Sequence, residues 1–131
     1  MKTTTEEISK AQDALRQSGI VNNVNEYDPV FSGYISSFGA SLVQAGLLPT
    51  IIFYEKPDSD AANRALTIKA LKKMMNLDDD TSMAAYIMNE KSNSGVRLCD
   101  DPAFLNSVVR NMTALKLALR MYKKISNDNV Q

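Results

Sequence analysis

The sequence predicts an all-α fold: a single domain over residues 1–131, built as a bundle of about six helices. Apolar residues recur at spacings of three and four along most of the chain, which is the period of a helix with one buried face. Only five glycines and four prolines interrupt the chain, and they fall between these periodic segments. The β-branched and aromatic run at residues 51–54 is the one strand-like segment, and it has no second segment to pair with.

The N-terminal half predicts three helices. The first covers roughly Thr5–Gln17, has two glutamates in its first turn, and ends at Ser18-Gly19. The polar residues 21–28 are expected to form a loop, and Asp28-Pro29 then starts the second helix as an N-cap and first-turn pair. A third helix is expected over Leu47–Lys56. The second helix has a clear apolar stripe, made by Phe31, Tyr34, Ile35, Phe38, Leu42 and Ala45.

Three further helices are predicted in the C-terminal half. The fourth follows the polar residues 57–60 and runs to about Met75, and the fifth covers about Thr81–Glu90. The last helix opens at Asp101-Pro102, a second N-cap pair, and is expected to reach about Ile125. Its stripe is the clearest in the sequence and consists of Phe104, Val108, Met112, Leu115, Leu119 and Tyr122.

Composition excludes several classes of function. The chain has no histidine, so Ser-His-Asp and Cys-His catalysis and histidine-ligated metal sites are ruled out. A single cysteine, Cys99, excludes an internal disulfide, and no histidine is present to activate it. Asp78–Asp80 lack the spacing of a calcium-binding EF-hand loop, and Asp80 is expected to cap the fifth helix. We therefore expect no catalytic residues, no metal and no cofactor.

The N-terminal residues and the hydropathy of the chain predict its location in the cell. The first residues are polar and do not resemble a signal peptide. No run approaches the 18 apolar residues of a membrane span. The sequence therefore predicts a cytoplasmic protein without a membrane partner.

Charge is polarised along the chain although its formal total is zero. Residues 1–60 carry four basic and eight acidic side chains, a net −4, and residues 61–131 carry eleven and seven, a net +4. Cations at helical pitch can neutralise successive phosphates of a nucleic acid, although solvated helix faces are also rich in lysine. The first candidates for phosphate contact lie on one stripe of the last helix or beside it: Lys116, Arg120, Lys123 and Lys124. The second group lies on the fourth helix and comprises Arg64, Lys69, Lys72 and Lys73, and the weaker candidates are Arg110 and Lys56.

Two segments resemble a known family. The stretch Phe31–Lys56 and the last helix are similar to the small helical subunit of the Cmr (type III-B) CRISPR effector complex. In the first segment the resemblance is carried by Tyr34, Gly46-Leu47, Phe53-Tyr54 and Lys56. In the last helix it is carried by Arg110, Thr113, Arg120, Lys123 and Lys124.

The resemblance implies a non-catalytic subunit that stacks along the complex and cradles the guide–target RNA through basic helix faces, in antiviral defence. Its implied partners are guide RNA and target RNA, contacted mainly through phosphates, the backbone and large subunits of the complex, and further copies of itself. RNA cleavage and signalling-nucleotide synthesis belong to other subunits in that family.

Other functions remain open on the sequence alone. A helical protein–protein adaptor without a nucleic-acid role is the main alternative, with seven methionines as a possible adaptable surface, although methionines more often fill a core. A small-molecule-sensing or enzymatic helical domain needs a pocket with perturbed ionisable groups, and a helix-turn-helix regulator needs a basic recognition helix. Neither feature stands out in the sequence.

Overall fold

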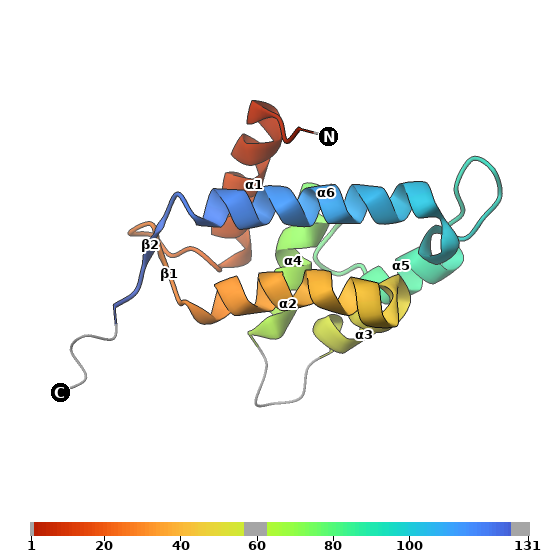
Figure 1. Cartoon of the computed structure of the whole chain (residues 1–131), viewed down its shortest axis with the longest axis horizontal. Coiled ribbons are helices and arrows are strands. Elements are labelled where there is room, and N and C mark those ends of the chain that lie inside the picture. The colour runs from red at the N-terminus through yellow and green to blue at the C-terminus, as the bar shows by residue number, and fades with distance from the viewer. Residues whose placement is uncertain (1, 57–62, 127–131) are drawn as a thin grey trace.

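The computed structural model describes residues 2–56 and 63–126, and the all-α prediction is confirmed there (Figure 1). The described part contains six α-helices, a short 3₁₀ turn and two strands of two residues each. In chain order these are α1 (Thr5–Ser18), β1 (Glu26–Tyr27), α2 (Val30–Ala45), α3 (Leu47–Glu55), α4 (Arg64–Met74), α5 (Met83–Asn89), η2 (Leu98–Asp100), α6 (Pro102–Leu119) and β2 (Lys123–Lys124).

The helices pack around one core in which α6 is central. α2 and α6 lie side by side and run in opposite directions, while α1 crosses α6 steeply and also packs on α4 (Figure 1). α3 packs against α4 and α5. The largest fully buried side chains come from all six helices: Phe38, Leu15, Ile51, Ile68, Leu71, Met83, Ile87, Leu115, Val108, Thr50 and Thr67.

Local capping fixes several helix ends where the sequence predicts them. α1 begins with a capping box, in which Thr4 and Glu7 each bond the other's backbone N–H. It ends at Gly19, whose left-handed φ of 89° favours glycine. The Asp101 carboxylate accepts the Ala103 N–H at 3.1 Å and caps α6, so this predicted start is confirmed.

In the middle of the chain, the described structure agrees with the helices predicted from the sequence. The segment from Leu47 to Glu55 is a helix, as predicted, and not a strand. Its Tyr54 hydroxyl donates to the Tyr34 carbonyl at 2.8 Å and joins α3 to α2. α4 begins at Arg64, and residues 57–62, which include the polar residues 57–60 after which this helix was expected to start, lie outside the described residues.

The predicted C-terminal end of the last helix is wrong. α6 ends at Leu119 and does not continue to Ile125, because the chain turns into β2 and pairs in parallel with β1. The Lys123 N–H donates to the Asn25 carbonyl at 3.2 Å, and the Ile125 N–H donates to the Tyr27 carbonyl at 2.8 Å. The segment expected to be a loop therefore supplies a strand, and this pairing replaces the last helical turn.

The predicted start of the fifth helix is also displaced. α5 begins at Met83, two residues after Thr81, and its N-cap is Ser82 and not Asp80. The Glu55 carboxylate accepts the backbone N–H groups of the first two residues of α5 and the Ser82 hydroxyl. A carboxylate from α3 thus satisfies the open N–H groups of α5, which the aspartates of the preceding loop do not reach.

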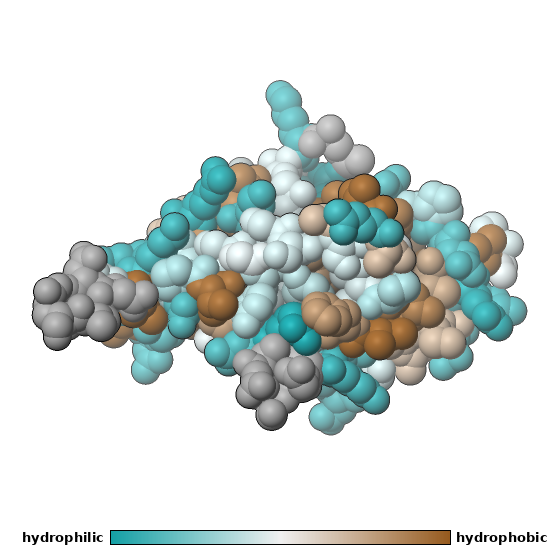
Figure 2. Space-filling model, turned by 60° about the horizontal axis from the view of Figure 1, so that its bottom comes forward, coloured by the Kyte–Doolittle hydropathy of each residue, from teal (hydrophilic) through white to brown (hydrophobic). Residues whose placement is uncertain are grey.

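Hydrophobic surface is unevenly distributed over the molecule. Figure 2 shows apolar residues gathered toward the end of the molecule at which α2 meets α3, with hydrophilic surface around them. The most exposed large apolar side chain of the described residues is Val43 on α2, which is 88% exposed. Phe53 on α3 is 58% exposed, and the Arg64 guanidinium lies 3.9 Å from its ring centre.

Candidate nucleic-acid interface

The C-terminal end of α6 and the strand β2 bring three of the candidate cations to one place. Lys116, Arg120 and Lys124 line a depression of about 200 Å³ between α6, α2 and β1. We call this depression the basic hollow. Its other lining residues are Tyr27, Ser32, Ile35, Ser36 and Leu119.

The strand pairing decides which lysine of β2 reaches the hollow. Glu26 lies opposite Lys123 and Tyr27 lies opposite Lys124 in the parallel register. Successive residues of a strand point to opposite faces, so Lys124 lines the hollow beside Tyr27, and Lys123 does not line it. The prediction that Lys123 extends the helical stripe is therefore wrong, because the helix has already ended.

The three cations are available to a ligand. Lys116, Arg120 and Lys124 are exposed, and no ion pair or side-chain hydrogen bond engages them among the residues that the structure describes. No carboxylate is among the described residues that line the hollow. Ser32 and Ser36 add two hydroxyl groups from the first half of α2. The lining therefore combines donors and positive charge, which suits a phosphate group.

The second predicted cluster, on α4, does not form a comparable surface. Lys72 is 8% exposed, and its Nζ donates to the backbone carbonyls of Asp79 at 2.9 Å and Thr81 at 3.0 Å. Lys73 forms an ion pair with Asp79 at 3.2 Å. Lys72 therefore holds the loop between α4 and α5, and the prediction that it belongs to a solvent-facing basic cluster is wrong.

The other two members of that cluster differ from them in their surroundings. Lys69 is half-buried, and Arg64 stacks on Phe53 with its Nε buried and without a described hydrogen-bond partner. The Arg64 guanidinium is thus held by an aromatic face of α3. Arg64, Lys72 and Lys73 thus contact α3 or the loop after α4, and the candidate interface does not include the α4 cluster.

The two weaker candidates also lie elsewhere. Arg110 makes a two-pronged ion pair with Glu7 of α1, including an Nη2–Oε1 hydrogen bond of 2.7 Å. This hydrogen bonding lowers the pKa of Glu7 from 4.5 to about 2, and the same pair raises the pKa of Arg110. Arg110 therefore joins α1 to α6. Lys56 is exposed at the end of α3, an element that contributes nothing to the hollow.

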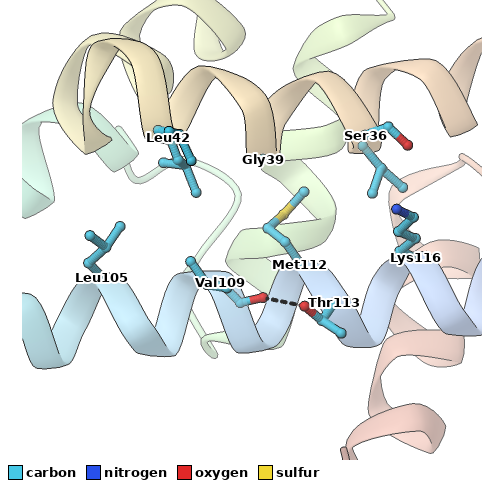
Figure 3. Close-up of a pocket in the computed structure, with 10 residues that line it drawn as sticks. Ser36, Gly39, Leu42, Leu105, Val109, Met112, Thr113 and Lys116 are labelled. Carbon is cyan, nitrogen blue, oxygen red and sulfur yellow. Dashed lines mark hydrogen bonds between the residues drawn. The ribbon is translucent and has the colours of Figure 1, made fainter.

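A second depression adjoins the basic hollow along the seam between α2 and α6, and we call it the apolar groove. It has a volume of about 350 Å³, and Ile35, Ser36 and Lys116 line both depressions. In Figure 3, Met112 points from α6 toward Gly39 of α2, and Lys116 points toward the Ser36 end. The remaining lining residues are Leu42, Val43, Leu105, Val109 and Thr113.

Sequence reasoning missed the α2 side of both depressions. Ser32 and Ser36 carry no charge and form no motif, so the sequence gives no sign that they meet Lys116. Gly39 does not mark a close contact with another element, since a Cβ placed there meets no atom within 4 Å. The antiparallel packing of α2 on α6 brings these residues together, and no local pattern encodes it.

The methionines do not form the adaptable surface that the adaptor alternative invoked. Met74, Met83 and Met112 are buried in the core, whereas Met88 and Met121 are exposed on α5 and after α6. Within the described ranges, the methionines therefore act mainly as core residues.

The chain matches no protein-family model, no curated protein and no solved structure. Across residues 2–56 and 63–126, no helix is long and apolar enough to cross a membrane. The same ranges hold no group of three or more acidic or cysteine side chains arranged around a common metal position.

Proposed function

We propose that this chain is a non-catalytic RNA-binding subunit that contacts backbone phosphates through the basic hollow. The observation that carries the proposal is the convergence of Lys116, Arg120 and Lys124, from two elements, on one depression whose described lining has no carboxylate. Lys123, on the opposite face of the strand, does not line the hollow and is not part of the proposed contact.

The lining favours phosphates over bases as the groups that are recognised. The aromatic ring in the hollow belongs to Tyr27, which is 3% exposed and is therefore not open for base stacking. Lysine, arginine and serine side chains supply charge and hydrogen-bond donors that fit phosphate oxygens of any sequence. We therefore expect binding with weak sequence preference and strong dependence on salt.

The resemblance to the small helical subunit of the Cmr complex supports the choice of RNA as the polyanion. In this proposal the chain works in the cytoplasm, stacks with further copies of itself and with the backbone and large subunits, and cradles the guide–target RNA. Because the whole chain is electrically neutral, a single copy binds weakly and aligned copies bind strongly.

The proposal is tested by RNA binding across a salt series. Fluorescence anisotropy with a labelled single-stranded RNA, from about 50 to 200 mM salt, compares the wild type with a Lys116/Arg120/Lys124→Ala variant. A matched control, Lys10/Lys91/Arg97→Ala, removes the same charge from exposed positions away from the hollow. Circular dichroism confirms that all three proteins are folded.

The expected result is specific to the hollow. The slope of log K against log salt is negative, and removing three phosphate contacts reduces its magnitude by about 2 for a single strand, whereas the control keeps the wild-type slope. An equal loss of RNA affinity in both variants contradicts the assignment of RNA binding to the hollow, because the loss then follows from the change in net charge. The same proteins, expressed with their native partners, test assembly: unchanged assembly and RNA binding in the hollow variant favour the adaptor function.

A further inference from the structure

The apolar groove is open because the residue of α2 at the middle of the groove is a glycine, which has no side chain. Gly39 lies across from Met112, and a Cβ at position 39 meets no atom within 4 Å. The floor is formed by Ile35 and Met112, which are 4% and 6% exposed, and Val43 and Val109 form the rims at 88% and 45%. An apolar depression with such exposed rims places hydrophobic surface in water unless a ligand covers it.

The groove has a direction, because its two ends differ in charge. At one end it joins the basic hollow through Lys116, beyond which lie Arg120 and Lys124. At the other end it is closed by Leu42 and Leu105. A ligand that fits the whole depression is therefore apolar along its length and anionic at one end.

The dimensions of the groove suit a single aliphatic chain. Lys116 and Leu105 are eleven residues apart on α6, which corresponds to about 16 Å along a helix. An extended alkyl chain built from C–C bonds of ~1.5 Å advances about 1.25 Å per carbon, so the groove takes roughly twelve carbons. A volume of about 350 Å³ also lies at the lower end of the range of small-molecule sites.

A protein helix fits the surroundings less well. A stable protein interface covers about 800 Å² on each partner. The lining of the groove has two exposed large apolar residues, Val43 and Val109, which is a small apolar surface for such an interface.

We infer that the apolar groove and the basic hollow together bind an amphiphilic anion: a single aliphatic chain with a phosphate or carboxylate head group. The chain lies over Gly39 and Met112, and the head group meets Lys116, Arg120 and Ser36. This inference does not depend on RNA binding, although both ligands use the same cations.

Two glycine substitutions on α2 provide a matched test. Gly39→Leu fills the groove, whereas Gly33→Leu places the same side chain on the same helix at a position that lines neither depression. A Cβ at either position meets no atom within 4 Å, and replacing a mid-helix glycine favours the helix, so both variants are expected to fold.

Isothermal titration calorimetry with monomeric octyl, decyl and dodecyl phosphate measures the affinity. We expect each added CH₂ group to tighten binding about two- to fourfold, the upper value being that of a fully buried group. Gly39→Leu is expected to weaken decyl phosphate binding at least tenfold, and Gly33→Leu to change it less than twofold. Decyltrimethylammonium, with the opposite head-group charge, is expected to bind at least tenfold more weakly than decyl phosphate.

Several outcomes overturn the inference. Equal affinity of decyl phosphate for the wild type and Gly39→Leu, or an affinity that does not depend on alkyl chain length, shows that the alkyl chain does not bind in the groove. Binding to anionic phospholipid vesicles without binding to monomeric alkyl phosphate assigns the surface to a membrane, and dimerisation that Gly39→Leu abolishes assigns it to a second copy. RNA binding separates this inference from the proposed function, because Gly39→Leu leaves the three cations in place and is expected to retain it.

Discussion

Replacing Lys72 with alanine is expected to destabilise the protein strongly, although the residue belongs to a lysine-rich helix segment. The Lys72 side chain is 8% exposed, and its ammonium group donates to two backbone carbonyls of the loop that precedes α5. Hydrogen bonds from a charged group contribute about 1.5–3 kcal/mol each, and part of this is recovered by water at the exposed loop. We therefore expect Lys72→Ala to lower the free energy of unfolding by about 2–3 kcal/mol.

The corresponding change in melting temperature follows from chain length. An unfolding entropy of about 2.1 cal/mol/K per residue over 131 residues makes 1 kcal/mol equivalent to about 3.6 °C. Lys72→Ala is thus expected to lower Tm by roughly 7–11 °C in calorimetry. Lys69→Ala, one turn earlier on the same helix, is expected to change the free energy of unfolding by at most about 0.5 kcal/mol.

Lys72→Met separates the contribution of the ammonium group from that of the aliphatic stem, because methionine keeps most of the stem and loses the ammonium group. Its loss of stability is expected to lie between those of the other two variants. Equal melting temperatures for Lys72→Ala and Lys69→Ala would refute the reasoning, since they would place both ammonium groups in solvent. RNA binding by folded Lys72→Ala at wild-type affinity is the companion expectation, because Lys72 lies outside the hollow.

Three further predictions concern helix ends and pH. Glu55→Ala removes the carboxylate that caps α5 and is expected to lower the free energy of unfolding by about 2 kcal/mol in urea denaturation, an effect that a substitution of the neighbouring Lys56 does not reproduce. The pKa of Glu7 falls from 4.5 to about 2 on folding, so its contribution to stability is complete above pH 4.5 and is lost as pH falls toward 2. Arg110→Met is expected to flatten this acid dependence in pH-jump denaturation curves, and an unchanged curve would contradict the pairing with Glu7. Asp101→Ala removes the α6 N-cap and is expected to cost about 1 kcal/mol by thermal denaturation, with Asp101→Asn restoring most of it.

Features encoded by neighbouring residues could be predicted from the sequence. The α6 stripe, the Asp101 cap and the Gly19 end of α1 each depend on residues within a few positions of one another. Their physical causes are helical periodicity, a side-chain oxygen near open N–H groups, and a left-handed backbone conformation. All of these can be read without knowledge of the tertiary structure.

Features made by distant segments could not be predicted in this way. The strand at Lys123–Lys124 forms because the chain meets residues 26–27, almost one hundred positions away, and two-residue strands leave no periodic signal. Glu55 reaches α5 across 28 positions, so the aspartates beside Thr81 were the nearer candidates for a cap.

The candidate site shows the same division. The cations at Lys116 and Arg120 were identified from their helical spacing, whereas Ser36 and Gly39 joined them only through the packing of α2 on α6. The sequence likewise could not distinguish Lys72, which is buried against a loop, from a solvent-facing lysine, because both satisfy the same helical pattern.

The most direct test of RNA binding at the hollow is an NMR titration of the ¹⁵N-labelled chain with a short single-stranded RNA. Amide shift changes report where the ligand lies without relying on a substitution. The proposal predicts that the largest changes cluster at residues 116–124 and at Ser32 and Ser36, on the two sides of the basic hollow. Changes centred on Lys69 and its neighbours in α4 would contradict it.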